Sequence, residues 1–355
     1  MFKLAIGALV SLLVMLAPAS AATAAMADTG DRVSAAPKKQ LSKPPRVKRK
    51  DLAKVIADDN RARMVRRIAM VHGKRQVSYA RLRSAHAIPV PLSAGDLVGL
   101  NHTPDPLELK SSVAYVLDQA NSEVLFEKNA GVALPIASIT KLMTGLIVVQ
   151  AQQDMSEVLT ITDDDVDRAK HTGSRLKVGT RMSRGNLLHL ALMSSENRAA
   201  AALGRNYPGG LAAFVDAMNA KAQELGMSDT RYVDSSGLSS RNVASARDLA
   251  KLAVVAHQEP LLREYSTDPK YIVSAGGRPM QFSNTNYLVA SPDWEIGLQK
   301  TGFINEAGRC LVMQAMIQGR AVIMVFLDSK GKQSRTADAG RMRKWLEALK
   351  TAPAL

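Results

Sequence analysis

Three Ser-x-x-Lys patterns in this chain could do chemistry. They are Ser138/Lys141, Ser174/Lys177 and Ser329/Lys332. Side chains three positions apart share a face at a helix start, so a neutral lysine amine could take the proton of the serine hydroxyl and make it a nucleophile. Only Ser138 follows a proline at the head of an apolar run, "PIASITKLMTG". The other two pairs lie in glycine-containing segments that we interpret as surface turns.

The predicted helix start favours this chemistry. We expect a helix from Ser138 to about Gln153, with Ile139 and Leu142 on its apolar face. Partial burial and the positive end of the helix dipole both lower the pKa of Lys141. Free backbone N–H groups at the same end suit an oxyanion.

Two later segments supply further groups. "SSENR" places Ser195 and Asn197 at a predicted break between two helical pieces, and "QKTGF" places Lys300, Thr301 and Gly302 on a predicted strand. Each pattern alone has an ordinary interpretation, because Ser195 could cap a helix and Lys300 could be an exposed strand lysine. Together, and in this order, they favour one site.

The elements that must position these groups are predicted from periodicity. "SVAYVLDQANSEVLFEKN" reads as two strands joined by a turn over residues 118–121. A helical middle follows, with a helix ending at Gly226 and another capped by Ser245. Three strands ("WEIGLQKTGF", "RCLVMQAMIQ", "RAVIMVFLDS") and a helix ("RTADAGRMRKWLEALK") complete the pattern. We predict an α/β (α+β) fold, with an antiparallel sheet built from both ends of the domain, flanking helices and an inserted helical subdomain.

The chain of 355 residues is expected to have four parts. Residues 1–21 resemble a cleaved signal peptide, with Lys3, an apolar run shorter than a membrane span and the small residues Ala19-Ser20-Ala21. Residues 22–96 form a basic, flexible arm, residues 97–350 the catalytic domain, and residues 351–355 a tail. The mature chain is therefore expected outside the cytoplasm, without a transmembrane segment.

The charge is concentrated in residues 31–85. This segment has 17 Lys+Arg and 4 Asp, a net charge of +13 against +15 for the whole chain. One interpretation is a solvated linker that includes a frayed helix over residues 52–71. The other is an electrostatic tether to an anionic envelope polymer or to lipid head groups. Nucleic acid is not expected, because the segment lacks interleaved aromatic residues.

No metal or other cofactor is predicted. The six histidines have no metal-ligand spacing. Cys310 is the only cysteine, so it cannot form a disulfide within the chain, and its apolar surroundings indicate a buried, inert thiol.

The ordered set Ser138–Lys141, Ser195–Asn197 and Lys300–Gly302 resembles the Ser-x-x-Lys, Ser-x-Asn and Lys-Thr-Gly motifs of the penicillin-interacting serine acyltransferases. The wider text, including "HTGSRLKVGT" and "GLSSRNVASARDLA", is similar to the D-alanyl-D-alanine peptidase family of low-molecular-mass penicillin-binding proteins, most of all to its endopeptidase type. The similarity covers roughly residues 97–349 and implies a serine β-lactamase/DD-peptidase-like fold.

The resemblance implies a covalent mechanism. Ser138 would attack the penultimate D-alanine carbonyl of a peptidoglycan stem peptide, and water would hydrolyse the acyl-enzyme. Lys141 would act as general base, and Ser195 would relay a proton to the leaving amine. β-Lactams would be covalent inhibitors, and the expected location is the periplasm.

The same resemblance assigns the binding groups. Asn197 would bind the substrate backbone. Lys300 would keep the site electropositive, Thr301 would contact the substrate carboxylate, and Gly302 would let the substrate lie against the strand. The oxyanion hole would be the backbone N–H groups of Ser138 and Phe303, with the Phe303 ring left to core packing.

Three alternatives stay open. A class A β-lactamase would carry a Glu-x-x-Leu-Asn segment after Asn197, and this chain has none, so we expect slow deacylation of penicillin. A carboxypeptidase relative would add a second β-rich domain and a membrane-binding tail, for which the roughly 50 residues after Lys300 leave no room, so an endopeptidase is favoured. A catalytically weak cell-wall-binding scaffold is the third.

Overall fold

The computed structural model describes residues 64–71, 74–81, 91–168, 170–275 and 277–351. The predicted signal peptide, most of the basic arm and residues 352–355 lie outside them. The chain divides into two units, residues 1–86 and 87–355, each of which is described by itself. None of the helices in the described ranges has the length and apolar character needed to cross a membrane.

The first unit contains an antiparallel hairpin. Strand β1 (Met64–Val71) pairs with β2 (Lys74–Arg81), and Val71 lies opposite Lys74. The prediction of a frayed helix is therefore wrong for residues 64–71. The β-branched residues Val65, Ile68 and Val71 favour extended backbone, and a Gly-containing pair between two strands is a typical hairpin sequence.

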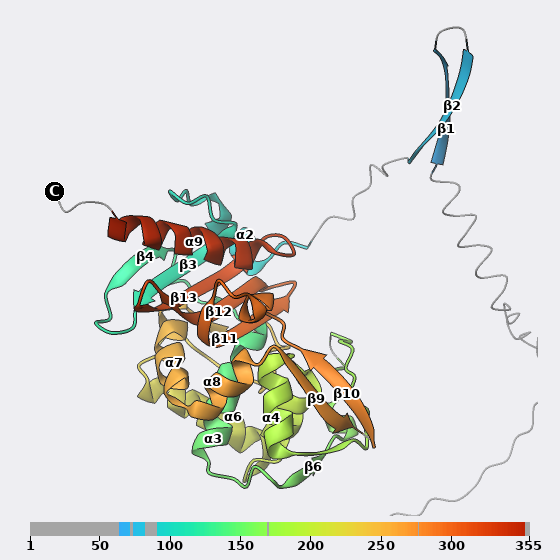
Figure 1. Cartoon of the computed structure of the whole chain (residues 1–355). Helices are drawn as coiled ribbons and strands as arrows, with labels where there is room; N and C mark the ends of the chain where they lie inside the picture. Colours follow the sequence, from blue (N-terminus) through green and yellow to red (C-terminus); the bar gives the residue numbers. More distant parts are fainter. Residues whose placement is uncertain (1–63, 72–73, 82–90, 169, 276, 352–355) are drawn as a thin grey trace, which may run out of the picture. The chain divides into compact units, whose positions relative to one another are not determined.

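The second unit is built on a five-stranded antiparallel sheet (Figure 1). Its order is β11 (Glu295–Ile304), β12 (Gly308–Ile317), β13 (Arg320–Ser329), β3 (Ser111–Asp118) and β4 (Val124–Lys128). Strands from both ends of the domain thus meet where β13 pairs with β3, which confirms the predicted architecture. Strand β11 lies at the edge.

The sheet has a hydrophobic core on each face. Helix α9 (Ser334–Thr351) covers one face, where Met342 packs in a cluster with Phe326 and Met324. The six longer helices from the middle of the chain lie on the opposite face (Figure 1). They are α3 (Thr140–Gln150), α4 (Arg184–Met193), α5 (Asn197–Arg205), α6 (Gly210–Glu224), α7 (Ala246–Gln258) and α8 (Pro260–Thr267).

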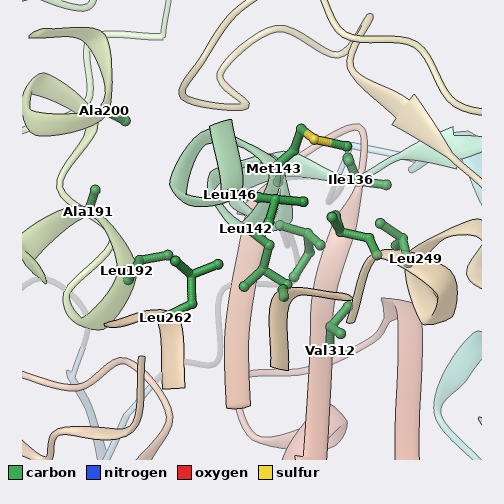
Figure 2. Packing of buried hydrophobic residues seen from close by; sticks show 14 of the residues in the cluster. Ile136, Leu142, Met143, Leu146, Ala191, Leu192, Ala200, Leu249, Leu262 and Val312 are labelled. Carbon is green, nitrogen blue, oxygen red and sulfur yellow. The ribbon is translucent and has the colours of Figure 1, made fainter. Parts of the chain in front are cut away.

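Helix α3 lies at the centre of the helical side. Leu142 and Leu146 are fully buried, and Figure 2 shows them among Leu192 of α4, Leu262 of α8 and Val312 of β12. A helix surrounded on all sides by apolar neighbours is held rigidly, because close packing leaves no room for a shift. The start of α3 is therefore a firm platform for a reactive group.

The smaller elements complete the unit. They are α2 (Ala94–Leu97), four 3-10 turns (Leu100–His102, Ala137–Ile139, Asp163–Asp165, Tyr287–Ala290), and the strand pairs β5 (Leu134–Pro135) with β8 (Val243–Ala244), β6 (Val158–Thr160) with β7 (Arg181–Ser183), and β9 (Lys270–Ala275) with β10 (Arg278–Ser283).

Local sequence signals behave as expected at two positions. The Ser245 hydroxyl caps α7 by accepting from the Asp248 backbone N–H. Cys310 on β12 is fully buried, and burial raises the pKa of its thiol to about 12, which supports an inert role.

Candidate active site

Ser138 lies in a 3-10 turn, residues 137–139, that runs directly into α3. The predicted helix start is therefore shifted, because the α-helix itself begins at Thr140. Ala137 has a positive φ of 48°, and its carbonyl accepts from the Thr140 hydroxyl at 2.8 Å. The Asn242 side-chain amide in turn donates to that hydroxyl at 3.0 Å. These contacts fix the half-buried Ser138 at the head of α3.

Lys141 lies one helical turn later and is fully buried. Its Nζ is 2.9 Å from Ser138 Oγ, 2.8 Å from Asn197 Oδ1 and 2.6 Å from the Ser236 carbonyl oxygen. Burial lowers the pKa of Lys141 to about 7, against the charges of Asp234 and Glu196, which raise it. The neutral amine is therefore well populated near pH 7.

The three contacts of Lys141 determine where its lone pair points. The side-chain oxygen of Asn197 and the carbonyl of Ser236 can only accept hydrogen bonds. A neutral amine has two N–H groups, and these two oxygens use both of them. The remaining lone pair is then directed at the Ser138 hydroxyl, the one neighbour that can donate.

Ser195 occupies the short link between α4 and α5. Its backbone has a φ of 62°, the left-handed region that residues other than glycine enter at a cost. The hydroxyl lies 2.9 Å from Lys300 Nζ, and the N-cap of α5 is Glu196, so the helix-cap interpretation of Ser195 does not hold.

Lys300 is fully buried on β11 and also donates to the Thr301 carbonyl at 2.9 Å. Burial, followed by the nearby charges of Lys141 and Arg335, lowers its pKa well below the ordinary value. The exposed-lysine interpretation is therefore wrong, and Lys300 is a weaker source of positive charge than its residue type suggests.

Gly302 brings the edge strand against the Ser138 turn. A Cβ added at Gly302 would lie 2.8 Å from the Ile136 carbonyl oxygen and 3.2 Å from the Ser138 amide nitrogen. Only glycine allows this approach. Next to it, the Thr301 hydroxyl lies 2.6 Å from that of Thr285.

The Phe303 ring differs from the expectation. It is 51% exposed instead of belonging to the core, and the Arg309 guanidinium lies 4.5 Å from its centroid. The ring alternates with the inward-facing side chains of β11 and therefore points to the surface.

A loop after α6, residues 234–239, is a part of the site that sequence analysis missed. Asp234 Oδ1 accepts from the backbone N–H groups of Ser236 at 2.7 Å and Gly237 at 2.6 Å, and its other oxygen accepts from the Ser239 N–H at 2.9 Å. Gly237 has a φ of 80°, and a Cβ there would lie 1.9 Å from the Ala137 carbonyl oxygen. The loop thus holds the Ser236 carbonyl against Lys141. The "DSSG" sequence, with its Asx-turn residue and glycine, is the available signal.

Arg335 and Thr172 were also missed. Arg335, at the start of α9, donates through Nη1 to the Gly302 carbonyl at 2.8 Å. Thr172 Oγ1 accepts from Asn197 Nδ2 at 3.0 Å, which orients that amide. Neither residue has a fixed sequence spacing to the three motifs.

The other two Ser-x-x-Lys pairs do not form such a site. Ser174 donates to Glu196 Oε2 at 2.6 Å, so it belongs to a loop that contacts the Ser195 link, but Lys177 is exposed. Ser329 donates to the Ser334 hydroxyl at 2.7 Å. In the described ranges, no group of three or more His, Cys, Asp or Glu side chains is arranged to hold a metal ion.

The arrangement is suited to acyl transfer. The Ser138 hydroxyl faces the lone pair of Lys141, and the Ser195 hydroxyl lies beside the amine of Lys300. The backbone N–H of Ser138 lies beside the edge strand at Gly302.

Comparison with known proteins agrees with this chemistry. Residues 100–331 match the family described as D-alanyl-D-alanine carboxypeptidase. A D-alanyl-D-alanine endopeptidase of Pseudomonas aeruginosa is 50% identical over 242 residues, which cover 68% of this chain and 78% of the relative. One from Escherichia coli is 40% identical over 282 residues, 79% of this chain and 91% of the relative. The cefotaxime-bound structure of penicillin-binding protein D2 from Listeria monocytogenes is 30% identical, with a TM-score of 0.61 over 68% of this chain and 98% of that one.

Proposed function

Since this chain belongs to the D-alanyl-D-alanine carboxypeptidase family of serine peptidases, we propose that it is a D-alanyl-D-alanine endopeptidase that acts on the cross-links of peptidoglycan. The endopeptidase relatives, at 50% and 40% identity, support this choice over a carboxypeptidase. The observation that carries the mechanism is the set of three oxygen atoms around Lys141 Nζ.

Acylation begins at Ser138. Its hydroxyl proton moves to the neutral amine of Lys141, and Oγ attacks the D-alanyl carbonyl carbon. The backbone N–H groups of Ser138 and Phe303 are proposed to bind the resulting oxyanion, and a donor in such a hole is typically worth about 3 to 4 kcal/mol. The approach of β11 at Gly302 supports this pairing.

The amine of the second peptide then leaves. The protonated Lys141 is proposed to return the proton that it took, through the Ser195 hydroxyl, to this amine, which leaves Lys141 neutral again. Lys300, 2.9 Å from Ser195, is proposed to orient that hydroxyl. Collapse of the intermediate re-forms the carbonyl as the ester of Ser138. Water hydrolyses the ester, with Lys141 again taking the proton.

Recognition groups surround the reacting bond. Asn197 is proposed to bind the substrate backbone, and its fixed orientation by Lys141 and Thr172 supports this. Thr301 is proposed to contact the substrate carboxylate. Arg335, which donates to the Gly302 carbonyl, adds a second positive charge beside Lys300.

The first test is covalent labelling with fluorescent penicillin, followed by mass spectrometry of the labelled peptide. We expect a stable adduct on Ser138, absent in Ser138→Ala and retained in Ser174→Ala, the serine of the second Ser-x-x-Lys pair. Digestion of purified cross-linked muropeptide dimers then tests the endopeptidase activity. No adduct in folded protein, or rapid turnover of a chromogenic cephalosporin, would contradict the proposal.

We also propose that residues 1–21 are a cleaved signal peptide and that the protein acts in the periplasm. Lys3, the apolar run and the small residues before Ala22 support this. Mature protein that starts near Ala22 in the periplasmic fraction is the expected result, and an intact N-terminus in the cytoplasmic fraction would refute it.

The basic segment 31–85 is proposed to tether the enzyme to an anionic envelope polymer or lipid surface. Its net charge of +13 supports electrostatic binding. Deletion of residues 31–85 should abolish salt-sensitive co-sedimentation with purified sacculi or anionic vesicles and leave penicillin acylation unchanged. Unchanged sedimentation would make the segment a linker.

A further inference from the structure

A basic groove runs beside the proposed active site. Its volume is about 660 Å³. One wall is the loop after Ser174, and the other is the β9–β10 hairpin, which lies beside α4 (Figure 1). The groove is lined by Arg175, Lys177, Val178, Gly179, Thr180, Ala275, Arg278, Pro279 and Met280.

The charged residues that line this groove are all basic, and Arg175 Nε lies 4.0 Å from the Glu196 carboxylate beside Ser195. Among its described lining residues three are cationic and none is acidic. The guanidinium of Arg175 is fixed 3.7 Å from the Phe282 ring centroid and donates to the Gln281 carbonyl at 2.7 Å. Lys177 and Arg278 are exposed, and neither has an ion-pair partner within the described ranges. Their charges are therefore available to an anionic ligand.

Both walls of the groove lead back to the reacting centre. Ser174, just before the first wall, donates to Glu196 beside Ser195 at 2.6 Å. Thr285, just after β10, contacts Thr301 at 2.6 Å. The groove thus adjoins the Ser195 and Thr301 side of the site, where the leaving amine receives its proton in the mechanism above.

A second hollow, which Asn197 itself lines, has the opposite charge. It has a volume of about 420 Å³, and Asp164, Asp165, Asp167 and Asp234 line it together with Lys170. A peptide rich in carboxylates is repelled there and attracted to the basic groove. The opposite charges of the two hollows therefore favour one orientation of a carboxylate-rich substrate in the site.

We propose that the basic groove binds the carboxylates of the stem peptide whose amine leaves, and so selects cross-linked substrates. The inference rests on the proposed endopeptidase function. Stem peptides carry free carboxylates along their length, and Lys177 and Arg278 match them in charge. A single D-alanine, the product of a carboxypeptidase, spans only about 3.5 Å and does not extend along the groove.

The test compares Arg278→Glu and Lys177→Glu with Lys344→Glu. Lys344 is an exposed lysine of α9, a helix on the opposite face of the sheet, so it carries the same charge change away from the groove. Three rates are measured: cleavage of a muropeptide dimer, removal of D-alanine from an uncross-linked pentapeptide, and acylation by fluorescent penicillin.

We expect each groove variant to lower kcat/KM for the dimer by about 3- to 5-fold, the upper end of what exposed charge pairs contribute. The loss should shrink at 0.5 M NaCl because of screening. Penicillin acylation and pentapeptide cleavage should stay within about twofold, and Lys344→Glu should change none of the rates. A dimer with amidated carboxylates should be cleaved slowly by the unmodified protein and equally slowly by Arg278→Glu.

Two results would overturn the groove assignment. One is dimer cleavage that is unchanged in both groove variants, and the other is an equal loss of all three rates, which would indicate a disturbed reacting centre. Failure of the underlying function is distinct, because the unmodified protein would then be acylated by penicillin and leave the dimer uncut.

Discussion

Lys141 connects the geometry of the site to the pH of its chemistry. Its two N–H groups are used by Asn197 Oδ1 and the Ser236 carbonyl, so only the deprotonated amine can accept from Ser138. The protein stabilises this form by burial, which lowers the pKa of Lys141 to about 7.

The acylation rate should therefore follow the fraction of neutral Lys141. Below about pH 7 the amine is protonated, and the rate should fall about tenfold per pH unit; above it the rate should level off. Stopped-flow acylation by fluorescent penicillin from pH 5 to 9 measures this. A flat profile across pH 5 to 7, or a limb near the ordinary lysine pKa, would contradict the assignment.

Asp234 is expected to shift this profile. Its negative charge raises the pKa of Lys141, so Asp234→Asn should move the acidic limb to lower pH. The asparagine oxygen can still accept from the Ser236 and Gly237 backbone N–H groups, so the loop keeps two of its three backbone contacts and loses the one to the Ser239 N–H. Asp164→Asn, at an exposed acid of the same hollow, is the control. An identical limb in both variants would exclude the effect.

At the scale of single residues, sequence analysis can identify the residues that belong to fixed motifs. Ser138, Lys141, Ser195, Asn197 and Lys300 could be named, and the structure brings these five together. The carbonyl of Ser236 could not be identified in this way, because a backbone atom takes part through the geometry of its loop, and residue type does not reveal that geometry. Arg335 reaches the site only by tertiary packing of α9 against β11.

Among the elements, β11 and the Ser138 turn depend on each other. Gly302 allows the edge strand to approach the backbone of residues 136–138, so a side chain there must push the two apart.

Gly302→Ala should destabilise the protein by about 1 to 3 kcal/mol through overpacking and should lower the penicillin acylation rate by more than tenfold. Gly340→Ala is the matched control. Its added Cβ meets nothing within 4 Å on α9, and alanine is the better helix former, so its Tm should be equal or higher. Acylation by Gly302→Ala at the unmodified rate would show that the close approach is not needed.

The elements differ in how well periodicity predicts them. The long strands β3, β12 and β13 carry continuous apolar runs bounded by turns, and these were predicted correctly. The β9–β10 hairpin was not, because its residues alternate weakly and include glycines and Pro279. Its pairing is supported by tertiary contacts, such as the stacking of Tyr271 on His189 at 4.0 Å.

At the scale of the whole molecule, the two faces of the sheet contribute differently to catalysis and to stability. Ser138, Lys141, Ser195 and Asn197 come from the helical side, Lys300, Thr301 and Gly302 come from the edge strand β11, and the α9 side carries a second core.

Met342→Ala should lower the stability of the protein without changing its acylation rate. Met342 lies on the buried face of α9 and is fully buried, so its truncation should cost about 2 to 5 kcal/mol of unfolding free energy. The acylation rate of the folded protein should stay unchanged, because the cavity opens on the face away from Ser138. Thermal unfolding and active-site titration at 20 °C measure both quantities, and a parallel loss of acylation would show that the two faces are coupled.

The pairing of β13 with β3 also sets a time order for the emerging polypeptide. During synthesis Ser138 appears long before Lys300, and β3 must wait for β13 before its neighbour on that side exists. Before Lys300 is made, Ser138 of the nascent chain is therefore unreactive. It lacks the edge strand against its backbone, and Ser195 lacks the Lys300 amine beside it. A chain that ends before β11 is therefore expected neither to cut the wall nor to be trapped by an antibiotic.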